Sequence, residues 1–170
     1  FAEGFRRGLK GVSVERVVQM GAGGAGAAVA HALLSEGVQL LSIFDVDIRR
    51  AQDLADNLNQ HFGVGRAVAG YDLPSAMAQA DGLVNTTPMG MKKLPGMPVP
   101  VALLRAELWV AEIVYFPLET ELLRNARALG CRTLDGGNMA VFQAVKAFEL
   151  FSGVVPDARR MLEHFQSMND

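Results

Sequence analysis

The stretch that decides the fold is MGAGGAGAAVAHALLSEG, residues 20–37, in which four glycines fall within six positions and lead directly into an alanine-rich helical sequence. It follows VVQM at 17–20, an apolar run with the length of a buried strand. A G-x-G-G-x-G motif between a strand and a helix is typical of a dinucleotide-binding turn. Residues 17–37 therefore predict a strand, a phosphate-binding turn and a helix, in that order.

Each glycine of this turn has its own expected role. Gly21 permits the tight turn after the strand, and Gly26 lets the helix lie close to that strand. The glycines between them let the backbone approach a pyrophosphate, which would bind the free N–H groups at the positive end of the helix dipole. We expect the cofactor-binding turn to consist of Gly21, Gly23, Gly24, Ala25 and Gly26.

Apolar runs of strand length alternate with segments of helical period along the chain. Strands are expected at 17–20, 40–44, 65–69, 82–87, 108–114 and 132–135. Helices are expected at 2–10, 24–36, 47–61, 74–80, 119–129, 138–152 and 156–167. Such alternation favours parallel βαβ units. The sequence therefore predicts a single α/β domain over residues 1–170, with a doubly wound Rossmann-type parallel sheet of about six strands and helices on both faces.

The composition excludes several classes of function. The chain has 170 residues, 50% of them hydrophobic, and a net charge of -2, which is typical of a soluble globular domain without the basic surface that nucleic acids require. No apolar run reaches the roughly 18 to 20 residues of a membrane span. Cys131 is the single cysteine and no Cys/His spacing indicates a metal site, so we expect a reducing, cytoplasmic compartment.

Asp45 ends the second expected strand and follows Gly26 by 19 residues. A carboxylate there can accept hydrogen bonds from both ribose hydroxyls of adenosine, whereas facing a 2′-phosphate it would incur a penalty of roughly several kcal/mol. This favours NAD over NADP. Arg49 and Arg50 keep NADP open, because an arginine just past this position can pair with a phosphate, although both could equally be solvated on the next helix.

The segment NTTPMGM at 85–91 follows the fourth expected strand, at the carboxyl edge of the sheet where ligands of such folds bind. Pro88 and Gly90 would hold this loop open. Met89 and Met91 offer adaptable apolar surface for a ring such as nicotinamide. The alternative is that these methionines fill the core.

Several motifs together resemble the shikimate and quinate dehydrogenase family over essentially the whole chain. They are GAGGAG at 21–26, DGLVNTTPMGM at 81–91, VYFPLETELL at 114–123 and DGGNMAVFQAVKAFELFSGVVP at 135–156. The likeness is greatest to the NAD-preferring quinate/shikimate branch. Asp45 stands where NADP-using members typically have Asn-Arg-Thr, and Val46 stands where their phosphate-binding arginine would lie.

The resemblance implies a set of binding residues. At the adenosine end it implies the glycine turn with Asp45 and Arg50, and at the nicotinamide end Thr87, Pro88, Met89, Ile113, Gly136 and Met139. For the substrate, a cyclic polyol carboxylate, it implies Tyr115 and Gln143, the latter through a hydrogen bond to a ring hydroxyl. From the residues alone, Tyr115 could instead end the fifth strand with its hydroxyl in water, and Gln143 could be an ordinary polar helix position.

The same resemblance places the catalytic residues outside this chain. In the family, hydride passes between a ring alcohol and the nicotinamide, while a Lys and Asp pair of an N-terminal substrate domain transfers the proton. Gly4 and Phe5 match the Gly-Phe that follows the family's Asp, which places that Asp at or just before position 1, where this chain has Phe1. The four lysines of this chain do not fall in the motif of the family's Lys. We therefore expect a fragment of a two-domain enzyme, with no catalytic residue here.

The terminal segments, residues 1–12 and 138–170, are expected to form hinge and closing helices toward that substrate domain. They should leave an apolar patch at Phe1, Phe5, Phe142, Phe148 and Phe151. Homodimerisation stays open, as does the choice between quinate and shikimate.

Two other functions stay open. One is a non-catalytic NAD-binding module or sensor without a substrate domain. The other is a two-domain dehydrogenase of the methylenetetrahydrofolate type, against which Gln143 in NMAVFQA argues. The remaining polar and aromatic candidates have structural interpretations: the three histidines as solvated or packed side chains, Trp109 and Cys131 as core, and Asp81 at the sheet edge opposite the cofactor.

Overall fold

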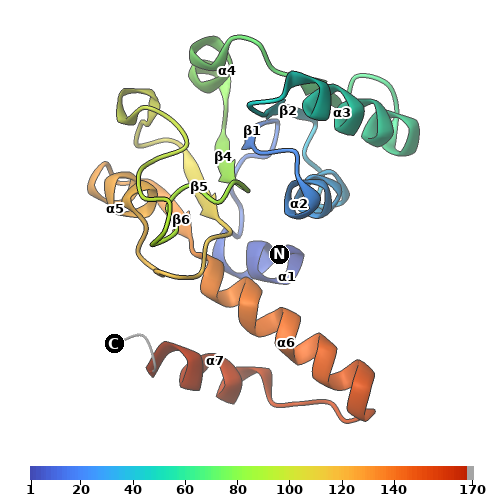
Figure 1. The fold of residues 1–170 in the computed structure, drawn as a ribbon, viewed down its shortest axis with the longest axis vertical. Helices are drawn as coiled ribbons and strands as arrows, with labels where there is room; N and C mark the ends of the chain where they lie inside the picture. The colour runs from blue at the N-terminus through green and yellow to red at the C-terminus, as the bar shows by residue number, and fades with distance from the viewer. Residues whose placement is uncertain (168–170) are drawn as a thin grey trace.

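Six parallel strands form the centre of the molecule in the computed structural model, which describes residues 1–167 (Figure 1). They are β1 (Arg16–Met20), β2 (Leu40–Phe44), β3 (Ala67–Ala69), β4 (Gly82–Asn85), β5 (Trp109–Glu112) and β6 (Arg132–Leu134). Their order in the sheet is β3-β2-β1-β4-β5-β6, and all neighbouring pairs are parallel. The chain therefore winds outward in one direction from β1 and in the other from β4, which confirms the predicted doubly wound sheet.

The helices lie close to the positions expected from the sequence. They are α1 (Ala2–Gly8), α2 (Gly24–Ser35), α3 (Ile48–Phe62), α4 (Leu73–Gln79), α5 (Glu121–Ala128), α6 (Gly136–Ser152) and α7 (Ala158–Ser167). A 3-10 turn, η1 (Val101–Leu103), was not expected, because three residues are too short to show a period. None of the helices in the described residues is long and apolar enough to span a membrane.

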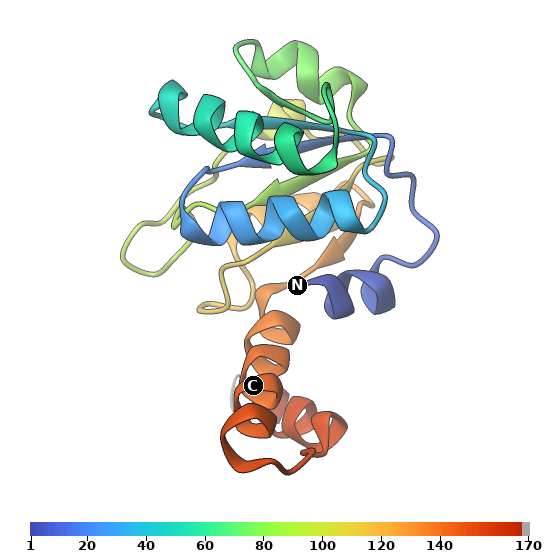
Figure 2. The same ribbon diagram turned by 90° about the vertical axis from the view of Figure 1, so that its right-hand side faces the viewer.

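Strand side chains alternate between two apolar cores, one on each face of the sheet. Val17 and Val84 pack with residues of α1, α2 and α3, whereas Val18 and Leu83 pack with residues of α4 and α5. Figure 2 shows α2 and α3 lying across one face. Because both faces are covered, most strand residues are apolar, as is usual in parallel sheets. The buried polar exceptions lie at or next to the carboxyl ends of their strands: Gln19, Asn85 and Glu112.

Helices α6 and α7 pack against each other and extend away from the sheet (Figures 1 and 2). Large apolar side chains are exposed at the end of α6 and in the segment that leads to α7: Phe148, Leu150, Phe151, Val154 and Val155. The expected apolar patch is therefore present at Phe148 and Phe151. The expectation is wrong for Phe5, which is only 5% exposed because its ring packs edge-on against Trp109, with the ring centroids 5.1 Å apart.

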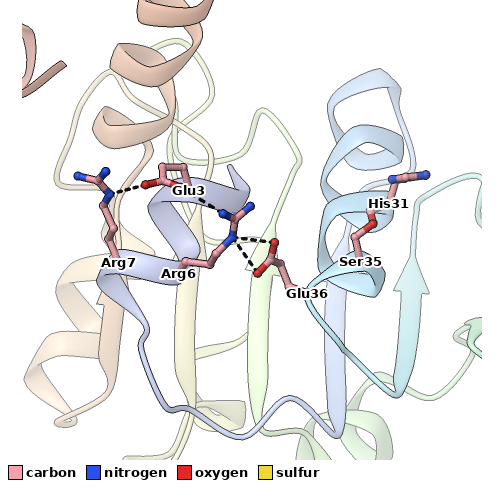
Figure 3. A network of polar contacts seen from close by, with 6 residues as sticks. All are labelled: Glu3, Arg6, Arg7, His31, Ser35 and Glu36. Carbon is pink, nitrogen blue, oxygen red and sulfur yellow. Dashed lines mark hydrogen bonds and ion pairs between the residues drawn. The ribbon is translucent and has the colours of Figure 1, made fainter. Parts of the chain in front are cut away.

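Charged side chains tie α1 to the end of α2, as Figure 3 shows. The Arg6 Nε donates hydrogen bonds to both carboxylate oxygens of Glu36, at 3.0 and 3.1 Å, and Arg7 pairs with Glu3 within α1. Beside them on α2, the Ser35 hydroxyl donates to the carbonyl oxygen of His31. These ion pairs lie at the surface, so each contributes little to the free energy of unfolding.

Candidate functional site

A cavity of about 560 Å³ opens at the carboxyl edge of the sheet, where the strand order reverses between β1 and β4. Three segments form its wall: the end of β1 with the glycine turn, the end of β2 with the start of α3, and the loop after β4. The lining residues are Met20, Gly21, Gly23, Phe44, Asp45, Val46, Arg50, Thr86, Thr87, Pro88, Met89, Leu94 and Pro98. Ligands of doubly wound folds bind at this position.

The glycine turn leaves no room for side chains at its two ends. Gly21 has a φ of +101°, and a Cβ there would lie 2.8 Å from the Thr86 hydroxyl oxygen. A Cβ at Gly26 would lie 2.4 Å from the Gly21 carbonyl oxygen. The strand, the turn and the first turn of α2 are therefore in backbone contact, as a G-x-G-G-x-G motif predicts.

The Gln19 side chain holds the glycine turn through hydrogen bonds to its backbone. Gln19 was not among the site residues predicted from the sequence. Its side chain is fully buried, and its Nε2 donates to the carbonyl oxygens of Gly21 and Gly26, at 2.9 and 3.0 Å. The signal in the sequence was a lone polar residue inside the apolar strand VVQM.

The start of α2 differs from the start of four other helices. Helices α3, α4, α5 and α6 each begin with an Asp or Thr whose side chain accepts a hydrogen bond from a backbone N–H of the first turn. Helix α2 begins at Gly23 with no side-chain cap and no acidic residue in its first turn. Its first closing bond is from the Ala27 N–H to the Gly23 carbonyl, so the preceding N–H groups have no partner within the helix. A helix start in this state can bind an anion.

Asp45 lies at the end of β2 and faces the glycine turn. One carboxylate oxygen accepts the Ala22 N–H at 2.7 Å and the other accepts the Asp47 N–H at 2.9 Å. These bonds hold the carboxylate in the cavity wall and leave further lone pairs on both oxygens. The structure thus places Asp45 beside the turn, as predicted.

The two arginines after Asp45 have different surroundings. Arg49 pairs with Asp47 at 3.3 Å, and its hydrogen bonds lower the pKa of Asp47. Arg50 lines the cavity. Val46, next to Asp45, also lines the cavity and has no charge to offer a phosphate.

The loop after β4 is attached to the glycine turn by Thr86. Its hydroxyl lies 2.7 and 2.9 Å from the carbonyl oxygens of Met20 and Gly21, and donates a hydrogen bond to this pair. The next residue, Thr87, donates from both its N–H and its hydroxyl to the Asn85 side-chain oxygen. The sequence reasoning named Thr87 and missed Thr86, since only the strand pairing shows that Thr86 meets the turn.

Eight predicted residues do not line the cavity: Gly24, Ala25 and Gly26 at the start of α2, and five residues farther along the chain. Ile113 and Gly136 meet near the ends of β5 and β6, where a Cβ on Gly136 would lie 2.6 Å from the Ile113 carbonyl oxygen. Met139 is half-buried in the first turn of α6. Tyr115 is 53% exposed in the loop after β5, and Gln143 is exposed on α6. Their binding roles stay predictions.

Most structural interpretations from the sequence are confirmed. Trp109 is 2% exposed and donates from its indole nitrogen to the Ser13 carbonyl oxygen. Asp81 accepts the Arg16 N–H at the edge opposite the cavity. Cys131 is buried, which raises its pKa. His31 packs against His61 and Phe62. Within residues 1–167, no cluster of three His, Cys, Asp or Glu side chains could hold a metal ion.

Known proteins share this sequence and fold over nearly the whole chain, although no protein-family model matches it. The NADP-named shikimate dehydrogenase of Streptomyces avermitilis is 60% identical over 164 residues, which are 95% of this chain and 56% of the relative. The NAD-named quinate/shikimate dehydrogenase of Corynebacterium glutamicum is 52% identical over 172 residues, which are 99% of this chain and 60% of the relative.

Solved structures agree with the sequence comparison. Quinate dehydrogenase from C. glutamicum in complex with NAD matches with a TM-score of 0.92 and 49% identity, over 98% of this chain and 60% of that one. Shikimate 5-dehydrogenase from Listeria monocytogenes in complex with shikimate and NAD matches with a TM-score of 0.79 and 29% identity, over 95% and 61%. The comparisons confirm the resemblance expected from the motifs, and the chain spans less than two thirds of these relatives.

Proposed function

We propose that this chain, a homologue of the shikimate and quinate dehydrogenases that corresponds to their C-terminal lobe, is the nicotinamide-cofactor-binding lobe of such an enzyme. The reaction would be reversible hydride transfer between a ring hydroxyl, of shikimate or quinate, and NAD(P). The observation that carries the proposal is the uncapped start of α2, which lies with Asp45 on one cavity.

The residues around the cavity fit a dinucleotide in three parts. The N–H groups at the start of α2 suit a diphosphate. Asp45 has lone pairs for the hydroxyls of a ribose. Pro88 and Met89 add an apolar surface for a flat ring. The bound cofactor would supply the hydride acceptor, and this chain would orient it.

We propose NAD as the preferred cofactor. The names of the relatives do not decide the matter, because they include both NAD and NADP enzymes. Asp45 favours NAD, because its carboxylate would lie against a 2′-phosphate. Arg50, which also lines the cavity, supports NADP as the second candidate.

The substrate, on this proposal, lies between this lobe and an N-terminal substrate domain that provides the proton-transferring Lys and Asp. Two observations support this arrangement. The chain spans 56–60% of its curated relatives. The end of α6 and the segment after it expose apolar side chains that a second domain would cover. Tyr115 and Gln143 stay the candidates for substrate contacts. We propose a cytoplasmic location, because the single cysteine of this chain suits a reducing compartment.

Calorimetry of the chain with NAD and NADP tests the cofactor assignment. We expect NAD to bind more tightly than NADP. Asp45→Asn should weaken NAD binding by about tenfold, because a charge-assisted hydrogen bond is lost, and should narrow the difference between the two cofactors. Asp56→Asn, on the exposed face of α3, is the matched control. No binding of either cofactor, or equal effects of the two variants, would contradict the assignment.

Initial rates of the complete natural polypeptide with quinate and with shikimate would test the reaction. We expect turnover with at least one acid. Measurable turnover by residues 1–170 alone would contradict the proposed location of the Lys and Asp pair, and no turnover by the complete polypeptide would favour a binding module.

A further inference from the structure

Glu112, the last residue of β5, is a buried carboxylate without a role in the site described above. Its side chain is only 2% exposed. It accepts hydrogen bonds from the Asn85 side-chain amide at 2.9 and 3.1 Å, from the Val114 N–H at 3.0 Å and from the Thr120 hydroxyl at 3.2 Å. Glu112 thus joins the ends of two strands to the start of α5.

Asn85 connects Glu112 to the loop that lines the cavity, because its side-chain amide forms hydrogen bonds with both. It lies opposite Glu112 in the register of β4 and β5, and its amide nitrogen also donates to the Met89 carbonyl oxygen at 2.9 Å. Its amide oxygen accepts the N–H and the hydroxyl of Thr87, at 3.0 and 2.7 Å. The Thr87 hydroxyl in turn accepts the Met89 N–H at 3.1 Å.

The Glu112 carboxyl group favours one orientation of the Asn85 amide. Asn85, Val114 and Thr120 all donate to the Glu112 carboxyl oxygens, so the Asn85 NH₂ group faces Glu112 and its carbonyl oxygen faces Thr87. With the amide turned over, two acceptors would meet at Glu112, and the donors of Thr87 would face an NH₂ group. Glu112 therefore favours the same orientation of the Asn85 amide as the Met89 carbonyl and the Thr87 N–H do, and so supports the loop conformation at Thr87–Met89.

Gly90, in the loop after β4, packs against the side chains of Thr120 and Glu112. Thr120 is the N-cap of α5, and a Cβ added at Gly90 would lie 3.3 Å from its methyl carbon and 3.8 Å from a Glu112 carboxylate oxygen. The loop therefore lies directly on the Glu112 and Thr120 side chains.

Stability alone does not explain an acid at this place. Burial raises the pKa of Glu112 to about 7, even though its hydrogen bonds from Val114, Asn85 and Thr120 lower it. No ion pair in the described part of the chain includes Glu112. A buried acid that is costly to ionise and is fully hydrogen-bonded is typical of a functional site.

We propose that Glu112 is a positioning residue for the nicotinamide end of the cofactor: through the Asn85 amide it holds Thr87, Pro88 and Met89 in the conformation that binds the ring. This inference rests on the proposed function. The inference extends the proposed function by assigning a role to a buried side chain that does not line the cavity.

The test compares NADH with ADP-ribose, which lacks the nicotinamide, on the full chain. Wild type should bind both, with a shift in the fluorescence of bound NADH. Glu112→Gln keeps the shape but cannot accept all three donors, so we expect about tenfold weaker NADH binding, a smaller fluorescence shift and unchanged ADP-ribose binding. Glu121→Gln, exposed in the first turn of α5, is the control with the same chemical change.

A second pair of variants keeps the test decisive if Glu112→Gln does not fold. Thr120→Val removes one hydroxyl donor to Glu112, and Thr120→Ser retains it. We expect a selective loss of NADH binding with valine and recovery with serine. Provided that the wild type binds both ligands, two results would overturn the positioning role. One is an equal loss of NADH and ADP-ribose binding in the variants, and the other is no loss of binding at all. A wild type that binds neither ligand would instead contradict the proposed function.

Discussion

At the scale of single residues, the four glycines of the turn divide into two kinds. Gly21 and Gly26 touch neighbouring backbone, so a side chain at either would disturb the fold itself. A Cβ at Gly23 or Gly24 would meet no atom within 4 Å. Packing therefore requires glycine at positions 21 and 26. Packing does not require glycine at positions 23 and 24, where the absence of a side chain instead leaves the backbone open to a ligand.

This division predicts opposite effects of two alanine substitutions on stability. Gly26→Ala should lower the free energy of unfolding by about 2 kcal/mol, because its Cβ would lie 2.4 Å from the Gly21 carbonyl oxygen. Gly24→Ala should leave stability unchanged or raise it by up to about 1 kcal/mol, because alanine favours helix. Urea denaturation measures both, and a Gly26→Ala variant as stable as wild type would contradict the close packing.

Glu112 predicts a dependence of stability on pH. Its pKa is about 7 in the folded protein and near the ordinary 4.5 when unfolded, so between these values the folded state binds more protons. The contribution of Glu112 to the free energy of unfolding is therefore greatest below pH 4.5. This contribution, roughly 3 kcal/mol in total, is lost as the pH rises through about 7. Glu112→Gln should remove this contribution. Thermal unfolding across pH 5–8 measures the difference, and parallel curves for the two proteins would be evidence against it.

At the scale of elements, α1 is held by one aromatic side chain more than by its charges. Phe5 packs into the core between Phe1 and Trp109, whereas the ion pairs of Arg6 and Arg7 lie at the surface. Buried aromatic area contributes several times more to stability than exposed ion pairs do.

Two substitutions in neighbouring positions of α1 test this ranking. Phe5→Ala should lower the free energy of unfolding by about 3 to 4 kcal/mol. Arg6→Ala should change it by less than about 1 kcal/mol, and by less still at high salt. Chemical denaturation at two salt concentrations measures both, and a larger loss with Arg6→Ala would reverse the ranking.

At the scale of the whole molecule, the sheet with α1–α5 and the pair α6–α7 differ in how they bury apolar side chains. The sheet is covered on both faces. Along α6 and the segment before α7, Phe148 is 50% exposed and Phe151 is 92% exposed. Patches of this kind mark interaction surfaces on soluble proteins.

Phe151→Ser should therefore reduce self-association of the chain and its binding of a hydrophobic dye. Its stability should stay within about 0.5 kcal/mol of wild type. Phe142→Ser is the contrasting variant: its ring is half-buried with the Arg7 guanidinium 5.4 Å from the centroid, so it should be destabilising. Light scattering and dye fluorescence measure the effect, and unchanged association in Phe151→Ser would show that the patch is not the contact surface.

The sequence by itself determined the alternation of strands and helices, the glycine turn and the acidic residue at the end of β2. Helix and strand periods, turn dihedrals and the spacing of a βαβ unit are local properties, so they are visible in a short stretch of residues. For the same reason the expected elements lie within a few residues of the observed ones.

The tertiary structure alone decided which residues meet at the site. Thr86 reaches the glycine turn, and Glu112 meets Asn85 across 27 residues of sequence, because β4 lies between β1 and β5 in the sheet. The tertiary structure also buried Phe5, which was expected in an apolar patch facing the substrate domain, and it placed the Gln19 side chain against the glycine turn. The burial and partners of a side chain depend on which elements become neighbours, and the order of elements in the sequence does not specify this.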